Sequence, residues 1–214
     1  LRVESRYFAQ VLQTKEAAAM IRSLFVSMQE LNKGARRPPA EPQRTIRKLG
    51  VLGAGFMGAG IAYVSAKAGI DVVLIDRDMQ AADKGKAHSD ALISKAVQQG
   101  RAAPAEKDAL LARIHPSADY ADLAGSDLVI EAVFEDRGVK ADVTPKAAAH
   151  LSGDAVFASN TSTLPITSLA QNFVDPARFI GIHFFSPVDR MMLVEIILGK
   201  KTGDRALAAA LDFV

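Results

Sequence analysis

From residue 46 onward, hydrophobic residues fall into short, nearly continuous runs that alternate with helical patterns. The runs predict strands at 48–52, 71–75, 128–133, 155–158, 179–185 and 193–198. The periodic stretches predict helices at 56–68, 79–99, 104–114, 139–151 and 204–214, with Pro145 either kinking the fourth helix or marking its first turn. Strands that are apolar along their whole length and separated by helices indicate an α/β fold, a doubly wound, mostly parallel sheet covered on both faces.

The first part of the chain has a different pattern. Residues 5–32 carry one apolar stripe at helical spacing, which predicts an amphipathic helix that ends near Gly34. A proline-rich connector follows, so we divide the chain into a linker helix with its connector, 1–45, and an α/β domain, 46–214. The stripe includes Phe8, Phe25 and Met28, and we expect it to pack against a domain that precedes this sequence.

Composition narrows the class of protein. The 214 residues are 49% hydrophobic and include no cysteine, which excludes disulfides, thiolate zinc sites and cysteine nucleophiles. No apolar run reaches the roughly 18 residues of a membrane span, so we expect no integral membrane segment. Residues 1–50 hold 10 Lys/Arg against 4 Asp/Glu, but these charges are spread out, which favours a solvated helix and linker over a nucleic-acid or membrane-binding surface.

The strongest motif is a glycine-rich loop between the first strand and its helix. Gly53 permits a tight turn, Gly55 allows a pyrophosphate to approach the backbone, and Gly58 lets the helix pack closely on the sheet. Asp76 ends the next strand, 23 residues after Gly53, where a carboxylate binds the ribose hydroxyls of NAD and repels the 2′-phosphate of NADP. Arg77 beside it can stack on adenine or soften that rejection. The motif predicts a Rossmann-type domain that binds NAD.

Polar side chains follow two later strands. Asn160 and Ser162 come after 155–158, and His183 lies on 179–185, twelve residues before Glu195 on the next strand. Ligands of doubly wound sheets bind at the carboxyl ends of strands. A histidine titrates near neutral pH and can accept an alcohol proton, and a carboxylate partner fixes its tautomer. The spacing is compatible with neighbouring strands joined by a turn.

These motifs together resemble a known family. GAGFMGAGIA, IDRD, VIEAVFED, FASNTS and HFFSPV with MLVEII look like the NAD-binding domain of L-3-hydroxyacyl-CoA dehydrogenases. The lead-in helix, basic linker and IRKLGVLGAGFMGAGIAYVSAKAGIDVVLIDRD are similar to α-subunits of fatty acid β-oxidation multienzyme complexes. The resemblance covers essentially the whole chain. It implies NAD-dependent oxidation of (S)-3-hydroxyacyl-CoA to 3-oxoacyl-CoA.

The resemblance also implies roles for individual residues. His183 matches the catalytic base, Glu195 its acidic partner, and Ser162 a serine that binds the substrate oxygen and the cofactor. The cofactor-binding positions that it implies, together with those of the glycine motif, are Gly53, Gly55, Phe56, Met57, Gly58, Asp76, Arg77, Glu135, Lys140, Asn160 and Ser162. Glu135 is preferred over Glu131 because it lies beyond the strand end. No metal is expected.

The acyl-CoA site is less defined. In the family a Ser/Lys pair on the helix after Asp76 contacts CoA, and Lys84, Lys86, Ser89 and Lys95 are candidates here. Ser186 stands where many members carry Asn, which puts nicotinamide contact by this residue in doubt. The resemblance further implies a hydratase domain before the helix, a helical dehydrogenase domain after residue 214, and a thiolase β-subunit as partner.

Two other functions remain open on the sequence alone. A β-hydroxyacid dehydrogenase of the 6-phosphogluconate type shares the GxGxMG loop, but it uses a catalytic lysine rather than a His–Glu pair. The second alternative is a domain that binds NAD without turning over a substrate. It stays open because we expect half of the active site to lie beyond this sequence. Abundant Ala and Arg favour a bacterial cytoplasmic protein, with a mitochondrial one as the alternative.

Overall fold

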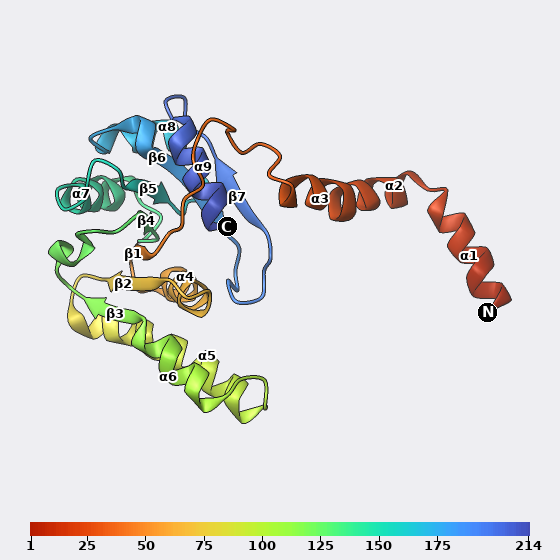
Figure 1. Ribbon diagram of the computed structural model, residues 1–214, viewed down its shortest axis with the longest axis horizontal. Helices are drawn as coiled ribbons and strands as arrows, with labels where there is room; N and C mark the ends of the chain where they lie inside the picture. Colours follow the sequence, from red (N-terminus) through yellow and green to blue (C-terminus); the bar gives the residue numbers. More distant parts are fainter. The chain divides into compact units, whose positions relative to one another are not determined.

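The computed structural model describes Leu1–Val214 and divides into two units, Leu1–Pro39 and Ala40–Val214 (Figure 1). The first unit is helical: α1 (Arg2–Leu12), α2 (Lys15–Ile21), a π-helical turn (Arg22–Val26) and α3 (Ser27–Asn32). None of these helices buries a side chain. Gly34 ends the unit's last helix with a φ of +79°, a left-handed conformation that suits glycine, as the sequence predicts.

The prediction of one continuous helix over 5–32 is wrong. The helix breaks between Leu12 and Lys15, because the Thr14 hydroxyl accepts a hydrogen bond from the Ala17 N–H at 3.1 Å and caps a new helix. A side-chain cap of this kind satisfies a backbone donor that would otherwise bond within the preceding turn. Residues 13–16, Gln-Thr-Lys-Glu, are all polar and leave a gap in the apolar stripe at the break, and the prediction of one helix passed over this gap.

The second unit is built on a seven-stranded sheet with the order β3-β2-β1-β4-β5-β6-β7. The strands are β1 (Lys48–Leu52), β2 (Asp71–Ile75), β3 (Ile114–Ser117), β4 (Leu128–Glu131), β5 (Val156–Ser159), β6 (Phe179–Phe184) and β7 (Val194–Ile197). All pairs are parallel except β6–β7, which is antiparallel. The chain crosses from β3 at one edge to β4 beside β1, which leaves a crevice at the carboxyl ends of β1 and β4. The predicted doubly wound sheet is confirmed.

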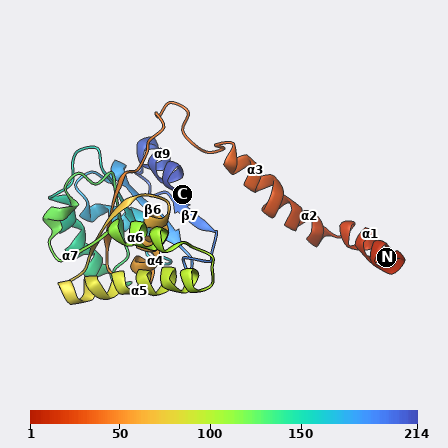
Figure 2. The same cartoon turned by 60° about the horizontal axis from the view of Figure 1, so that its bottom comes forward.

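Helices cover both faces of the sheet. They are α4 (Phe56–Lys67), α5 (Met79–Gln98), α6 (Pro104–Ala112), α7 (Arg137–Ala148), α8 (Ile166–Leu169) and α9 (Asp204–Phe213), with short 3-10 turns at Tyr120–Leu123, Ala170–Asn172 and Pro176–Arg178. The predicted start of the fourth helix is wrong: α7 begins at Arg137, and Pro145 lies inside it. Asp136 determines that start, because its carboxylate accepts the Val139 N–H at 2.9 Å. α5 and α6 lie side by side (Figures 1 and 2).

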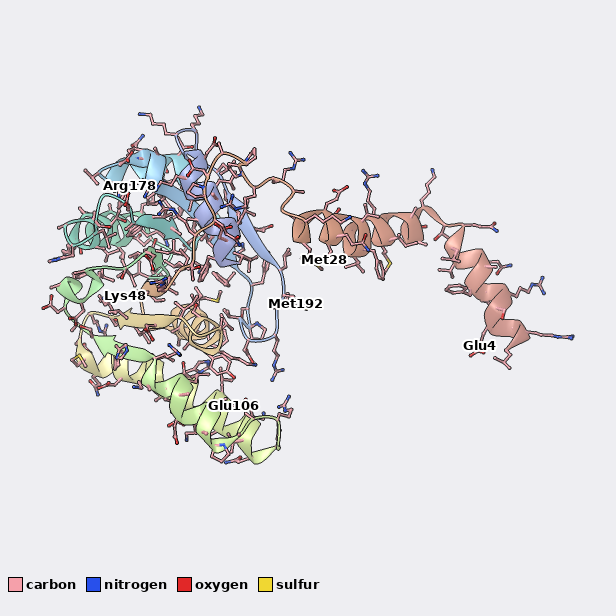
Figure 3. All side chains as sticks on the ribbon, viewed as in Figure 1. Glu4, Met28, Lys48, Glu106, Arg178 and Met192 are labelled. Atoms are coloured by element: carbon pink, nitrogen blue, oxygen red, sulfur yellow. The ribbon has the colours of Figure 1, made fainter.

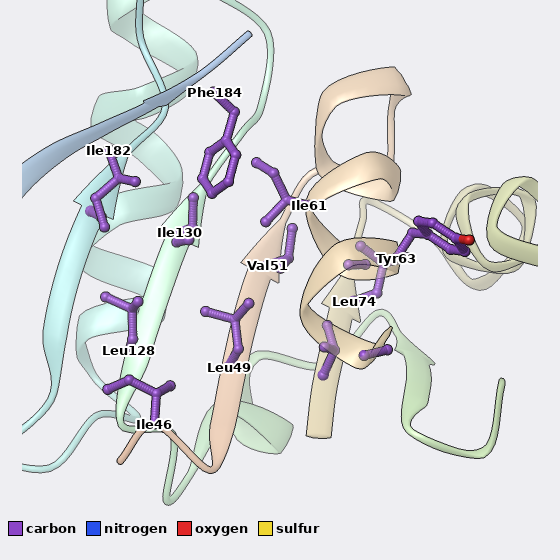
Figure 4. Close-up of a cluster of buried hydrophobic side chains, with 14 of the residues drawn as sticks. Ile46, Leu49, Val51, Ile61, Tyr63, Leu74, Leu128, Ile130, Ile182 and Phe184 are labelled. Atoms are coloured by element: carbon purple, nitrogen blue, oxygen red, sulfur yellow. The ribbon is translucent and has the colours of Figure 1, made fainter. Parts of the chain in front are cut away.

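Alternating residues of the strands enter two separate cores. Leu49 and Val51 of β1 face a cluster that includes Ile61 of α4 and residues of α5, α6 and α9 (Figure 4). Leu52, together with Phe157 of β5, faces the opposite cluster under α7 and α8. Each fully buried side chain of this size contributes about 1.5–3 kcal/mol. Burial on both faces is why the strand sequences are apolar at successive positions.

One strand is missing from the sequence prediction. The helix expected over 104–114 ends at Ala112, and Ile114–Ser117 forms β3 at the sheet edge, paired in parallel with β2. Its sequence, Ile-His-Pro-Ser, has no apolar run and contains Pro116. Proline is tolerated on an edge strand because one side of that strand needs no ladder hydrogen bonds. A short polar edge strand therefore carries little signal in the sequence.

Candidate active site

The glycine loop after β1 places its three motif glycines in three different environments. Gly53 has a φ of +92°, and a Cβ there would lie 2.8 Å from the Ala132 carbonyl oxygen. A Cβ on Gly58 would lie 1.7 Å from the Gly53 carbonyl oxygen. A Cβ on Gly55 would meet nothing within 4 Å. The tight turn therefore requires glycine at position 53, and the close contact between α4 and this turn requires glycine at position 58. Gly55 borders open space, where the pyrophosphate of a dinucleotide can approach the backbone.

Helix α4 begins at this open space. Gly55 is its N-cap residue and contributes no side-chain hydrogen bond, so the N–H groups of the first turn are left for another acceptor. Phe56 is 59% exposed and packs its ring edge-on against His88, with ring centroids 5.8 Å apart. The N-terminus of a twelve-residue helix carries partial positive charge and suits a phosphate.

The Asp76 carboxylate lies directly beside the loop. Its Oδ2 accepts the Ala54 N–H at 2.6 Å, and its Oδ1 accepts the Arg77 N–H at 2.7 Å. These two bonds orient the carboxylate and leave further lone pairs for ribose hydroxyls. The Arg77 side chain is 85% exposed, and its Nε lies 3.3 Å from Asp78 Oδ2. Because both side chains are exposed, this ion pair is weak and does not fix the Arg77 side chain.

We expect NADH to bind at least about tenfold more tightly than NADPH, a difference of about 1.4 kcal/mol. The oriented Asp76 carboxylate repels a 2′-phosphate and accepts hydrogen bonds from free ribose hydroxyls. Fluorescence titration of the bound dinucleotides measures both dissociation constants. Asp76→Asn removes the charge and narrows the ratio, whereas Asp83→Asn, on the exposed surface of α5, leaves it unchanged. Equal affinities of the unaltered chain would refute the preference.

A pocket of about 360 Å³ opens at the carboxyl ends of the central strands. Residues from α4, from the segments after β4 and β5, and from the end of β6 line it: Met57, Ala132, Val133, Glu135, Asn160, Ser162, His183, Phe184, Phe185 and Ser186. The structure thus brings together Met57, Glu135, Asn160, Ser162 and His183 from the residues that the sequence singled out. Ala132, Val133 and the two phenylalanines lie in the motifs VIEAVFED and HFFSPV, but they carry no polar side chain and the sequence assigned them no role.

His183 and Glu195 form a pair across the antiparallel strands β6 and β7. The two residues are direct partners in the strand register, and His183 Nδ1 lies 2.9 Å from Glu195 Oε2. The histidine side chain is 16% exposed and the glutamate 51%. With Nδ1 bonded to a carboxylate, the neutral ring carries its proton there and presents a free Nε2 lone pair. The loop that joins these two strands is exposed: Met192, which lies near its end, is 90% exposed (Figure 3).

The segment after β5 is held at the pocket by hydrogen bonds. Asn160 Oδ1 accepts the Phe184 N–H at 2.9 Å and so ties the ends of β5 and β6 together. Glu135 accepts hydrogen bonds from the Thr161 hydroxyl and from the Ser162 N–H, the latter at 3.2 Å. These contacts leave the Ser162 side chain exposed at the pocket. Thr161 belongs to the FASNTS motif, but the sequence assigned it no role; its buried hydroxyl anchors this segment.

Lys140 is not presented to the pocket. Its side chain is 1% exposed, and its ammonium lies 2.8 Å from Glu131 Oε1 and 3.2 Å from Glu135 Oε2. Glu131 is equally buried and also accepts the Ser159 hydroxyl at 2.8 Å. In this structure Lys140 therefore holds Glu135, and Glu135 is the member of the group that lines the pocket. A glutamate on a buried strand signals that a partner exists, but the sequence does not say which.

A larger cavity of about 1040 Å³ lies between α4, α5 and α6 and shares no lining residue with the pocket at His183. Lys95, one of the candidate CoA contacts, lines this cavity. Ser89 is fully buried and its hydroxyl has no hydrogen-bond partner, so it does not face the solvent. The smaller pocket contains His183 of the His183–Glu195 pair together with Met57 of the glycine motif.

The glycine loop, the acid after β2 and the switch in strand order define a dinucleotide-binding domain of the Rossmann type. The family model described as "3-hydroxyacyl-CoA dehydrogenase, NAD binding domain" matches residues 48–214. The chain belongs to this family, and its cofactor is NAD. None of its helices combines the length and the hydrophobicity that a membrane span requires.

Similar proteins support the same family. The chain is 39% identical over 208 residues to the fatty acid oxidation complex subunit alpha of Psychrobacter arcticus, covering 97% of this chain and 29% of that protein. The crystal structure of (S)-3-hydroxybutyryl-CoA dehydrogenase from Ralstonia eutropha matches with a TM-score of 0.74 and 38% identity, covering 78% of this chain and 62% of that one. The Escherichia coli 3-hydroxybutyryl-CoA dehydrogenase matches with a TM-score of 0.74 and 32% identity, covering 78% and 37%.

Proposed function

We propose that this chain supplies the cofactor domain and the catalytic base of an NAD-dependent (S)-3-hydroxyacyl-CoA dehydrogenase, which oxidises the 3-hydroxyl group to a ketone. The observation that carries the proposal is the His183–Glu195 pair, with Nδ1 and Oε2 2.9 Å apart, at a pocket that also contains Met57 of the glycine-loop helix. A base that faces a dinucleotide-binding loop suits the oxidation of an alcohol.

The residues present fit NAD. The open space at Gly55 and the N-terminus of α4 suit the pyrophosphate, and the Asp76 carboxylate suits the adenine ribose. The nicotinamide end would lie in the pocket at the carboxyl ends of the strands, beside Met57, Glu135 and Asn160. NAD supplies the hydride acceptor when it is bound.

His183 takes the hydroxyl proton in this proposal. Its Nε2 accepts the proton of the substrate alcohol while hydride leaves C3, and the imidazolium so formed is stabilised by Glu195 across the strand pair. Ser162 donates a hydrogen bond to the substrate oxygen from the exposed end of the segment after β5. Asn160 keeps that segment beside β6 through its bond to the Phe184 N–H. The reverse reaction uses the same groups with His183 as the acid.

The chain spans 29% of the length of the fatty acid oxidation complex α-subunits that it matches, and those proteins come from bacteria. We infer that it acts in fatty acid β-oxidation in the bacterial cytoplasm, with acyl-CoA as substrate. A hydratase domain of the same polypeptide and a thiolase subunit would be its partners.

We expect the 214-residue chain to bind NADH but to reduce acetoacetyl-CoA poorly. The pocket at His183 is bounded by this domain on one side, and the remainder of the α-subunit length would supply the other side. NADH fluorescence titration and a steady-state assay at 340 nm, run on the chain and on the complete polypeptide, separate binding from turnover. Turnover of the 214-residue chain equal to that of the complete polypeptide would contradict the incomplete pocket. Absence of turnover in both, with NADH bound, would favour a binding domain without catalysis.

A further inference from the structure

Three charged side chains form a line from the core to the pocket. Glu131 at the end of β4 and Lys140 on α7 are each 1% exposed, and Glu135 is 34% exposed. The Lys140 ammonium lies 2.8 Å and 3.0 Å from the two Glu131 oxygens and 3.2 Å from Glu135 Oε2. Only Glu135 lines the pocket. The two buried residues therefore affect the pocket through their charge and through the position of Glu135.

Glu131 is fixed independently of any ligand. Besides the ammonium, its carboxylate accepts the Val133 N–H at 2.9 Å and the Ser159 hydroxyl at 2.8 Å. Burial raises the pKa of Glu131, while the charge and hydrogen bonds of Lys140 oppose that rise. A carboxylate that accepts this many hydrogen bonds beside an ammonium remains ionised at lower cost than an unpaired one.

Glu135 connects the buried Glu131–Lys140 pair to the segment after β5, which borders the pocket. Its Oε1 accepts hydrogen bonds from the Thr161 hydroxyl and from the Ser162 and Thr163 N–H groups. Partial burial raises the pKa of Glu135, but the bonds from Thr161 and Lys140 and the Lys140 charge outweigh it, so the pKa lies below its usual value. The group of two carboxylates and one ammonium thus carries one net negative charge at the pocket wall.

We propose that Glu131 is a positioning residue that holds Lys140 against Glu135 and sets the net charge of this group, so that the pocket favours the oxidised cofactor over the reduced one. The nicotinamide ring is a cation in NAD⁺ and neutral in NADH, so a nearby negative charge stabilises only the oxidised form. The inference rests on the proposed function, because that function brings the nicotinamide to this pocket.

The test is a series of variants that changes the charge of the group and then restores it. Glu131→Gln brings the group to zero. Lys140→Met removes the ammonium that opposes the raised pKa of the buried Glu131, so Glu131 takes up a proton and the group stays at −1. The double variant is also at −1. We expect the ratio of the NAD⁺ dissociation constant to the NADH dissociation constant to rise at least about threefold in E131Q, and to stay near the parent value in K140M and in the double variant. Calorimetric titration of the 214-residue chain measures both constants. Ser159→Ala is the matched control, because it removes one hydrogen bond to Glu131 without changing charge.

The outcomes separate this inference from the proposed function. A ratio that is the same in E131Q and the parent, or one that rises in the double variant as much as in E131Q, would overturn the charge-setting role. If E131Q does not fold, K140M and the double variant decide as the pH is raised. The ratio should then fall in K140M, as Glu131 loses its proton, and stay constant in the double variant, and a constant ratio in both would overturn the inference. A parent chain that binds neither form of the cofactor contradicts the proposed function and this inference with it.

Discussion

Replacement of His183 by alanine is expected to lower kcat for acetoacetyl-CoA reduction by the complete protein by at least about a hundredfold, the low end for loss of a general acid or base. The ring is the titratable group at the pocket whose proton position is fixed by a carboxylate, Glu195, at 2.9 Å. Alanine removes the Nε2 atom and leaves the glycine loop and Asp76 intact. The dissociation constant of NADH should therefore change by less than about threefold.

The control for this experiment is His150→Ala, an exposed histidine beyond the end of α7, which should leave kcat unchanged. Glu195→Gln should cause a smaller loss than His183→Ala, because an amide oxygen still accepts the Nδ1 proton but no longer stabilises the imidazolium. A His183→Ala enzyme with near-normal turnover would remove His183 from the mechanism.

Replacement of Gly58 by alanine should lower the free energy of unfolding by at least about 3 kcal/mol, the upper part of the range for overpacking. The added Cβ would lie 1.7 Å from the Gly53 carbonyl oxygen, and backbone cannot yield as a side-chain tip does. Either α4 or the turn must move. Alanine's higher helix propensity, worth about 1 kcal/mol, offsets only part of this cost. Urea unfolding followed by circular dichroism measures the change.

Gly55→Ala is the matched comparison, because a Cβ there meets nothing within 4 Å. We expect its unfolding free energy to stay within about 1 kcal/mol of the parent, as for an N-cap glycine replaced by alanine. NADH affinity should nevertheless fall at least about tenfold, since the methyl group occupies the space that the pyrophosphate needs. A stable Gly58→Ala protein, or a Gly55→Ala protein with unchanged NADH affinity, would contradict this division of roles.

The sequence predicted the centre of the sheet well because burial on both faces leaves a strong pattern there. The strand and helix on either side of Gly53–Gly58 match the structure, with α4 ending one residue before the predicted end. The edge strand β3 was missed because an edge needs neither continuous apolar residues nor every backbone donor. The break at Thr14 was missed because the apolar residues before and after the polar segment 13–16 were joined into one helix, and the cap by the Thr14 hydroxyl was not considered.

For the candidate site, the sequence motifs predicted most of the polar residues that line the pocket, but not the contacts between them. The twelve-residue spacing of His183 and Glu195 allowed a strand pair, and the structure makes them register partners. Lys140 matched a cofactor position, yet its burial between Glu131 and Glu135 depends on how α7 packs beside β4. Such a contact is set by tertiary packing, which no local spacing encodes.

The antiparallel register of β6 and β7 has a consequence for how this site tolerates change. His183 and Glu195 meet because both occupy one rung of the ladder, and side chains alternate faces at every residue. Insertions in the connection between Phe185 and Leu193 would lengthen an exposed loop and keep the rung. A single residue inserted within β7 between Val194 and Glu195 would turn the carboxylate to the opposite face. The loop between the strands can therefore change length without breaking the pair. An insertion of one or two residues inside a strand, between the loop and either partner, moves His183 and Glu195 off their shared rung.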